Sequence, residues 1–264
     1  MLEPTTPWKD EMTPQPAPPA HRRPGRPSTA SSVEPSSTRT VDRALALLDA
    51  VLGEDAPASL SHLSRAVGLS ASTASRLLET LTRHGLVERR DDGRYGTGIR
   101  LKQLAAAALR DDPLYELSGP HLEQLAADTR EVASLGIPLG PEEVLYLRQV
   151  VAQGQLVQAV GWVGRTIPRD DTALGKALDG QLEPSGYAVS ARPENEVDAV
   201  AVPVFDHGGA IVGALSVSAP RYRTSLEDLH RFGGVLLGHA AQLSAALGAS
   251  AEVITRRTSG TPGR

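Results

Sequence analysis

The stretch GLSASTASRLLETLTRHGLVERRDDGRYGT, residues 68–97, decides the fold of the amino-terminal part of the chain. Ser70 can cap a helix, because a serine at this position accepts a hydrogen bond from a backbone N–H of the first turn. Behind it, apolar residues at i, i+3, i+4 and i+7 predict a helix with one buried stripe. These residues are Ala74, Leu77, Leu78 and Leu81. Two short runs then flank an Asp-Gly turn at residues 91–93, which predicts a β-hairpin.

Two more helices are predicted upstream of this stretch. The first starts near Thr40, ends at Gly53 and has a single apolar stripe at helical spacing. The stripe consists of Val41, Ala44, Leu45, Leu48 and Leu52. A short second helix over about residues 59–67 is predicted to bury Leu60, Leu63 and Val67. Three helices and a hairpin, with only two residues between the second and third helices, are typical of a winged helix-turn-helix domain, predicted over residues 39–97.

The side of the third helix opposite its apolar stripe suits contact with double-stranded DNA. Its short hydroxyl side chains can bind phosphate or either type of base edge, and Arg76 can bind guanine or phosphate. Arginines at the start of the first helix and around the hairpin can hold the DNA backbone on either side of the groove. The predicted DNA-binding residues are Arg39, Thr40, Arg43, Ser70, Ser72, Thr73, Ser75, Arg76, Arg89, Arg90 and Arg94. A winged helix that contacts another protein, with its arginines solvated, is the alternative.

The distribution of charge agrees with a DNA-binding segment followed by a domain of another kind. Residues 39–110 carry eleven Arg and Lys against eight Asp and Glu, a net charge of +3, whereas residues 111–264 carry a net charge of −7. Residues 1–38 hold nine of the 20 prolines and are predicted to form a disordered arm. The chain has no cysteine, no signal-peptide pattern and no long apolar run, so the sequence predicts a cytoplasmic protein without membrane contact.

Downstream of the hairpin, the pattern predicts a linker helix and a mixed α+β domain. The linker, residues 98–112, contains a helix at 99–110, and longer helices are expected at 114–130 and 225–247. Short apolar runs between these two helices predict a mostly antiparallel sheet. The runs are residues 132–137, 144–150, 156–160, 200–205 and 211–217. The domain is placed at residues 113–250, and residues 251–264 are predicted to form a disordered tail.

Residues in both parts resemble those of IclR-type bacterial transcription regulators. In the amino-terminal part, the resemblance is carried by Arg43-Ala44-Leu45-x-Leu47-Leu48 and by Gly68-Leu69-Ser70-x-Ser72-Thr73-x-x-Arg76-Leu77-Leu78-x-Thr80-Leu81. Downstream it continues through Pro168, Thr172-Ala173-Leu174-Gly175-Lys176-Ala177, Ala201-Val202-Pro203-Val204-Phe205-Asp206 and Val212-Gly213-Ala214-Leu215-Ser216-Val217-Ser218-x-Pro220. The resemblance implies an α+β chain with a winged helix-turn-helix and a shortened, GAF-like antiparallel-sheet domain that binds a small organic effector. It also implies dimers, often paired into tetramers, that meet through the DNA-binding domain and the linker helix.

The resemblance further implies an effector pocket between the turn-and-helix segment and the last strands. Carried over to this chain, its residues are Thr172, Ala173, Leu174, Ala199, Ser216 and Ser218. Ser216 and Ser218 are two apart on a predicted strand, so both hydroxyls point to one face. Beside the N-terminus of the helix that follows Thr172, they could hold a carboxylate. Serines that only fill the sheet and bond to backbone are the alternative.

The sequence departs from the family between Ala177 and Tyr187, where a longer helical stretch is reduced to residues 178–186. This departure implies a more open cavity, a different class of ligand, or no ligand. It leaves a second function open beside effector sensing: a ligand-blind protein that binds DNA and dimerises through a degenerate effector domain.

The sequence thus predicts a transcriptional repressor that binds a pseudo-palindromic DNA operator as a homodimer or homotetramer and responds to a small acidic or aromatic effector. Catalysis is not expected. The seven histidines lack the spacing of a metal site, and no serine stands in a Gly-x-Ser-x-Gly elbow. Leu174-Gly175-Lys176 lacks the upstream glycine of a phosphate-binding loop. We therefore expect no metal, no cofactor and no enzymatic activity.

Overall fold

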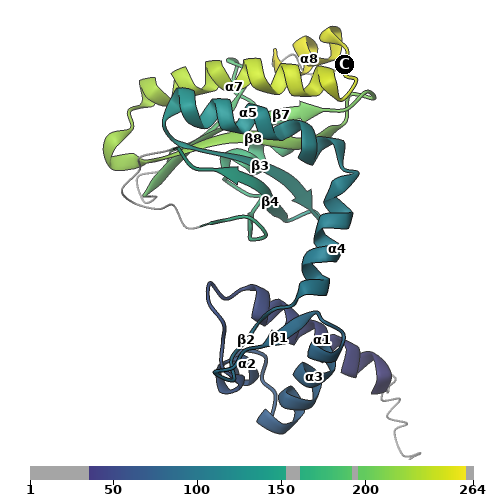
Figure 1. Cartoon of the computed structure of the whole chain (residues 1–264). Helices are drawn as coiled ribbons and strands as arrows, with labels where there is room; N and C mark the ends of the chain where they lie inside the picture. Colours follow the sequence, from purple (N-terminus) through teal and green to yellow (C-terminus); the bar gives the residue numbers. More distant parts are fainter. Residues whose placement is uncertain (1–35, 153–160, 192–195, 260–264) are drawn as a thin grey trace, which may run out of the picture. The chain divides into compact units, whose positions relative to one another are not determined.

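The computed structural model describes residues 36–152, 161–191 and 196–259 (Figure 1). The chain divides into two compact units, Met1–Asp42 and Arg43–Arg264. Helix α1 (Ser36–Leu52) begins in the first unit and continues into the second. Most of the predicted disordered arm lies outside the described residues. Its last three positions, 36–38, are helical, so the predicted boundary of the arm is wrong.

Three helices and a hairpin form the winged helix-turn-helix in the predicted order. After α1 come α2 (Leu60–Ala66), α3 (Ala71–Arg83), β1 (Val87–Arg89) and β2 (Tyr95–Thr97). Their shared core is apolar and consists of Leu47, Leu48, Val51, Ala58, Leu63, Ala74, Leu78, Leu81, Val87 and Tyr95. This fold confirms the prediction from the sequence.

The buried side of α1 differs from the predicted stripe. Leu47, Leu48 and Val51 are buried, whereas Leu45 and Leu52 are 52% and 48% exposed. The helix has apolar residues on two sides, and spacing alone does not tell which side meets the core. The prediction was therefore wrong for most of the stripe, and the second apolar side is left uncovered by the described part of the chain.

The linker helix α4 (Ile99–Arg110) has the predicted bounds, and none of its side chains is buried. Ile99 and Leu104 are 66% and 49% exposed. Leu101 is partly buried against the core of the winged helix. A helix of this length is marginally stable in water without packing of its apolar side, so α4 carries apolar surface that the described residues do not cover.

An antiparallel sheet forms the carboxy-terminal part, as predicted. Its strands are β3 (Val132–Leu139), β4 (Glu143–Val150), β5 (Thr166–Pro168), β6 (Ala188–Ser190), β7 (Val197–Phe205) and β8 (Ile211–Pro220). They pair in the order β5-β4-β3-β8-β7-β6, and every pair is antiparallel. The sequence did not predict β5 and β6, and the run predicted at residues 156–160 lies outside the described residues.

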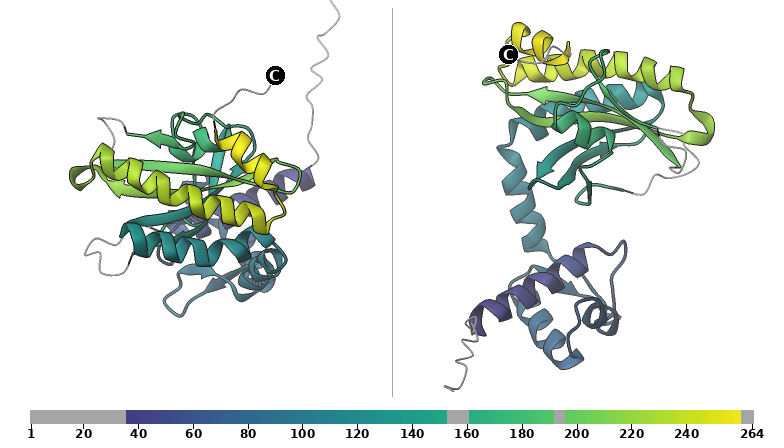
Figure 2. Two further views of the ribbon diagram at one scale, coloured as in Figure 1. Left: turned by 90° about the horizontal axis from the view of Figure 1, so that it is seen from above. Right: turned by 180° about the vertical axis from the view of Figure 1, so that it is seen from behind.

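Helices cover the two faces of this sheet unequally. Helices α5 (Pro113–Thr129) and α7 (Leu226–Ala246) lie side by side on one face (Figures 1 and 2). Leucines, valines and alanines of that sheet face form a core with them. The short helix α6 (Ala173–Leu178) packs on the other face against small residues such as Ala201 and Ala214.

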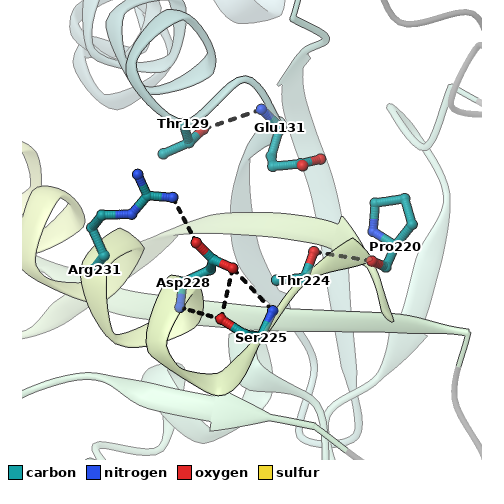
Figure 3. Close-up of polar contacts among 7 residues, drawn as sticks. All are labelled: Thr129, Glu131, Pro220, Thr224, Ser225, Asp228 and Arg231. Atoms are coloured by element: carbon teal, nitrogen blue, oxygen red, sulfur yellow. Dashed lines mark hydrogen bonds and ion pairs between the residues drawn. The ribbon is translucent and has the colours of Figure 1, made fainter. Parts of the chain in front are cut away.

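A capping box fixes the start of α7 (Figure 3). The Ser225 hydroxyl accepts a hydrogen bond from the Asp228 backbone N–H, and the Asp228 carboxylate accepts from the Ser225 N–H at 3.0 Å. The Ser225 hydroxyl also donates to this carboxylate, which lowers the pKa of Asp228 more than its other interactions do. Arg231 completes the group by donating to Asp228 at 2.8 Å. The helix therefore begins where the sequence predicted.

The predicted disordered tail is wrong for residues 251–258, which form helix α8 (Ala251–Thr258). Its N-cap Ser250 accepts a hydrogen bond from Val253 N, and Val253 and Ile254 are partly buried. A capping serine and two adjacent apolar residues are enough to dock a short amphipathic helix. No helix in the described ranges is long and apolar enough to cross a membrane.

Candidate DNA interface and effector site

Helix α3 separates an apolar side from a polar side. Ala74, Leu78 and Leu81 are buried in the core of the winged helix. The first turn is held by Ser70, whose hydroxyl accepts a hydrogen bond from Thr73 N at 3.3 Å. The same hydroxyl lies 2.9 Å from the Thr73 hydroxyl and 3.2 Å from that of Ser72. The predicted hydroxyl residues thus form one cluster at the N-terminus of α3.

The exposed side of α3 carries cationic groups without acidic partners. Arg76 is exposed, and its guanidinium forms no hydrogen bond or ion pair with the residues that the structure describes. Ser75, one position earlier, is partly exposed. On α1, Arg39, Thr40 and Arg43 are exposed as well. A helix N-terminus with exposed hydroxyl and guanidinium groups can bind phosphates or base edges in a major groove.

The arginines of the hairpin are exposed but engaged. The backbone N–H of Arg94 donates to the Asp92 carboxylate at 3.0 Å and lowers the pKa of Asp92 most, and Arg94 Nε, which donates to the same carboxylate at 2.8 Å, lowers it further. Arg90 lies 3.4 Å from Glu88, and Arg89 stands over the ring of Tyr95. These exposed pairs are weak, so phosphate could replace the carboxylates. Of these three arginines, Arg89 alone has no acidic partner among the residues that the structure describes.

The sheet face under α6 brings together three predicted effector-binding residues. Ser216 and Ser218 of β8 pair with Ala201 and Ala199 of β7. Because side chains two positions apart on a strand point to the same face, Ala199, Ser216 and Ser218 share the face that carries Ala201 and Ala214. Ser216 is 1% exposed, whereas Ser218 and Ala199 are partly exposed.

The Ser216 hydroxyl is buried and has no hydrogen-bond partner among the described residues. Its neighbour on β3 in the sheet register is Ser134. Ser134 differs from it, because its hydroxyl accepts a hydrogen bond from Gln149 at 3.4 Å. An unsatisfied buried hydroxyl costs about 1–3 kcal/mol. Ser216 is therefore a site where an acceptor from outside the chain would be stabilised.

The residues predicted from the α6 segment have mainly structural positions. The Thr172 hydroxyl caps α6 by accepting from Gly175 N at 3.1 Å, and it donates to Pro168 O at 3.0 Å. Ala173 and Leu174 are buried. A Cβ at Gly136 would lie 2.9 Å from Leu174, so Leu174 packs directly onto β3. These three side chains flank the sheet face but present no free polar group to it.

Sequence reasoning missed several polar and aromatic groups on this face. Ser134 and Gln149 extend the row of Ser216 across β3 and β4. Ser190 on β6 donates to the backbone oxygen of Asp171 at 3.0 Å. Tyr146 lies next to Gly136 on β4, and burial raises its pKa to about 12. Ser134 could have been found from the alternation of small and large residues along β3. The other groups lie on this face because of the strand register, which the sequence does not show.

Comparison with known proteins agrees with both parts of the fold. The IclR helix-turn-helix domain matches residues 40–91, and the carboxy-terminal domain of bacterial IclR transcriptional regulators matches residues 180–245. The regulator KdgR of Escherichia coli K12 is 27% identical over 252 residues, covering 81% of this chain and 95% of KdgR. The repressor AllR of the same strain is 25% identical over 268 residues, covering 87% and 98%.

Solved structures give the same result. The crystal structure of an IclR transcriptional regulator from Alicyclobacillus acidocaldarius superposes with a TM-score of 0.67 at 25% identity, over 80% of this chain and 99% of that one. The fold and these relatives define the class, a helix-turn-helix transcriptional regulator rather than an enzyme. Within this class, the chain carries matches to both domains of the IclR family of bacterial transcriptional regulators.

Proposed function

We propose that this regulator is a repressor that binds a pseudo-palindromic DNA operator as a dimer or a pair of dimers and responds to a small organic acid. The exposed, capped side of α3 carries the proposal for DNA binding. There the Arg76 guanidinium and the hydroxyls of Ser70, Ser72 and Thr73 lie on the side opposite the core. A helix used only for packing would bury or pair the Arg76 guanidinium.

The proposed DNA contacts fall into two groups. Ser70, Ser72, Thr73, Ser75 and Arg76 of α3 are assigned to the major groove, where Arg76 binds a base edge or a phosphate. The second group consists of Arg39, Thr40 and Arg43 of α1 and Arg89, Arg90 and Arg94 of the hairpin. These residues are assigned to backbone phosphates, which set affinity and its salt dependence without reading sequence.

Self-association is supported by apolar surface on α1 and α4. Leu45, Leu52, Ile99 and Leu104 are all about half exposed or more. Because a linker helix without any buried side chain gains little stability alone, a second copy that covers its apolar side is the simplest source of the missing contacts. Two-fold symmetry of the resulting dimer would match a pseudo-palindromic operator, with half-site centres about 34 Å or a multiple apart.

Effector binding is supported by the unpaired hydroxyl of Ser216. We assign the ligand to the sheet face of Ala199, Ser216 and Ser218, beside the α6 segment of Thr172, Ala173 and Leu174. A carboxylate is the matching group, because it offers acceptor oxygens to a buried donor. The nearby Tyr146 and Trp162 rings, 5.8 Å apart, favour an acid with an aromatic or other flat body.

A ligand-blind repressor is the second candidate, and a specific observation favours it. The Thr172 hydroxyl is already used within α6, and Leu174 is packed into the core, so two of the six assigned residues have roles without a ligand. Thermal unfolding with a panel of small carboxylic and aromatic acids separates the candidates. A rise in midpoint that Ser216→Ala abolishes supports sensing, whereas no rise with any acid supports the ligand-blind repressor.

DNA binding is tested directly by fluorescence anisotropy with fragments from upstream of the gene. The full chain should bind one fragment with a strong salt dependence, and Arg76→Ala should weaken this binding. Arg256→Ala is the matched control, because it removes one exposed arginine from α8 without touching the winged helix. Equal binding by both variants and the unmodified chain would remove α3 from the DNA interface.

A further inference from the structure

A cavity of about 320 Å³ lies on the opposite side of the sheet from Ser216, between α7, α8 and β7. The side chains of this sheet face, such as Val202, belong to the core shared with α5 and α7, to which Leu236 of α7 also contributes. The cavity lies within the range of about 300–1,000 Å³ that is usual for small-molecule sites. Neither the proposed DNA interface nor the proposed effector site uses it.

Helix α8 forms one wall of this cavity and rests on backbone at both of its ends. At its start, the Val253 side chain lies against Gly209 in the β7–β8 turn, where a Cβ would approach it to 3.0 Å. At its end, the Thr258 carbonyl oxygen lies against Gly186, where a Cβ would approach it to 2.7 Å. Ile254 and Thr258 face the cavity between these two supports. Helix α8 lies beside the carboxy-terminal part of α7 (Figures 1 and 2).

The lining of the cavity is apolar and electrically neutral. Beneath α8 it consists of Val202, Pro203 and Phe205 from β7 and of Leu237, Gly238, Ala240, Ala241 and Ser244 from α7. The Ser244 hydroxyl is saturated, since it donates to Ala240 O at 2.6 Å and accepts from Phe205 N at 3.0 Å. The Thr258 hydroxyl donates to Ile254 O at 2.8 Å. A charged ligand would therefore find no partner here.

We propose that this cavity is a second ligand site, which binds an uncharged apolar molecule the size of one or two aromatic rings. An apolar cavity of about 150 Å³ is already large enough to bind benzene, because it is dry and the ligand has no bound water to displace. A ligand here contacts α7 and α8 together and ties α8 to the domain. The site is distinct from the proposed effector site in both ligand chemistry and place in the fold.

Two glycines of α7 provide a matched pair of variants for the test. A Cβ at Gly238 or at Gly234 would meet nothing within 4 Å, and both positions are within the helix. Leucine at either position removes a helical glycine, which raises stability by a similar amount. Only Gly238 lines the cavity. Gly238→Leu therefore fills the site, and Gly234→Leu is its control.

The experiment measures thermal unfolding of the full chain with indole and with toluene, two neutral aromatic probes. At tenfold excess over its dissociation constant, a bound probe should raise the midpoint by about 3–6 °C. We expect this rise in the unmodified chain and in Gly234→Leu and its loss in Gly238→Leu. Ala241→Leu, which fills the same cavity from the next turn, replaces Gly238→Leu if that variant does not fold.

Three results would overturn the proposal: no rise with either probe in the unmodified chain, an undiminished rise in the filled variant, or a loss of the rise in Ser216→Ala. The last result would assign the probes to the sheet face of the proposed effector site. Failure of the acid panel leaves this test intact, because the two sites take ligands of different charge.

Discussion

Ser134 and Ser216 lie directly opposite each other on the antiparallel strands β3 and β8, and only one of the two hydroxyls is satisfied. Ser134 accepts a hydrogen bond from Gln149, whereas the buried Ser216 hydroxyl has no partner in the described part of the chain. The sheet thus holds a row of polar side chains, Gln149, Ser134 and Ser216, and the hydroxyl at its end, that of Ser216, forms no hydrogen bond with the described residues. A chain that gained nothing from this open donor would be more stable with alanine at position 216.

The first prediction concerns this stability. Ser216→Ala should leave the free energy of unfolding unchanged or raise it by up to about 1–3 kcal/mol, because it removes an unsatisfied buried hydroxyl. Ser244→Ala is the matched control: its hydroxyl accepts from Phe205 N, so its loss should lower stability by about 1–3 kcal/mol. Urea denaturation of both variants without ligand measures the difference. Equal destabilisation by the two would mean that Ser216 has a structural partner.

The second prediction concerns the linker helix. Leu104→Glu should convert the proposed dimer into monomers at micromolar concentration, because the carboxylate would have to be buried against the second copy. Gln103→Glu introduces the same charge one residue earlier, about 100° around the helix from Leu104, and should leave the proposed dimer intact. Light scattering after size-exclusion chromatography measures both. A dimer that survives Leu104→Glu would place the interface elsewhere.

The third prediction follows from two histidines that join α5 and α7. The Nδ1 atoms of His121 and His239 lie 3.1 Å apart. Burial lowers the pKa of both rings below 6.5, and for His121 the neighbouring ring lowers it further. The unfolded chain therefore binds more protons than the folded one just below pH 6.5, so stability should fall as the pH falls through this window.

Replacing one ring tests this pH dependence. In His239→Gln, the decrease in the unfolding midpoint below pH 6.5 should be smaller than in the unmodified chain, and above pH 7 the two curves should run parallel. Asp128, Gln124 and the partner ring face this site, and the variant leaves them unchanged. Curves that stay parallel from pH 5 to pH 8 would show that the two rings titrate as they do in the unfolded chain.

The sequence predicted the helices and strands well where a hydrophobic periodicity extends over several turns. It failed where tertiary contacts determine the structure. The bounds of α4 and the start of α7 were correct, because the spacing of their apolar residues marks them locally. The predicted buried side of α1 was wrong. The helix has two apolar sides, and only the tertiary packing determines which of them is buried. Strands β5 and β6 have three residues each, too few for an alternation to show, and they exist because they pair with β4 and β7.

The candidate effector face shows the same division. Alternation along β8 placed Ser216 and Ser218 on one face without any knowledge of the fold. Ser134 and Gln149 join them only through the register of β3 and β4, which no local pattern specifies. The same holds for α8, which depends on Gly186 and Gly209 as backbone supports.

The central claim, that the exposed side of α3 binds operator DNA, is tested most directly by anisotropy titrations of Arg76→Ala at several salt concentrations. We predict a loss of specific affinity of about tenfold or more, corresponding to about 1–3 kcal/mol for a base-reading arginine, with relaxed preference at one base pair. A phosphate contact would instead weaken all sequences uniformly and reduce the salt slope by about one. An affinity and a salt slope equal to those of the unmodified chain, at every concentration, would contradict the account.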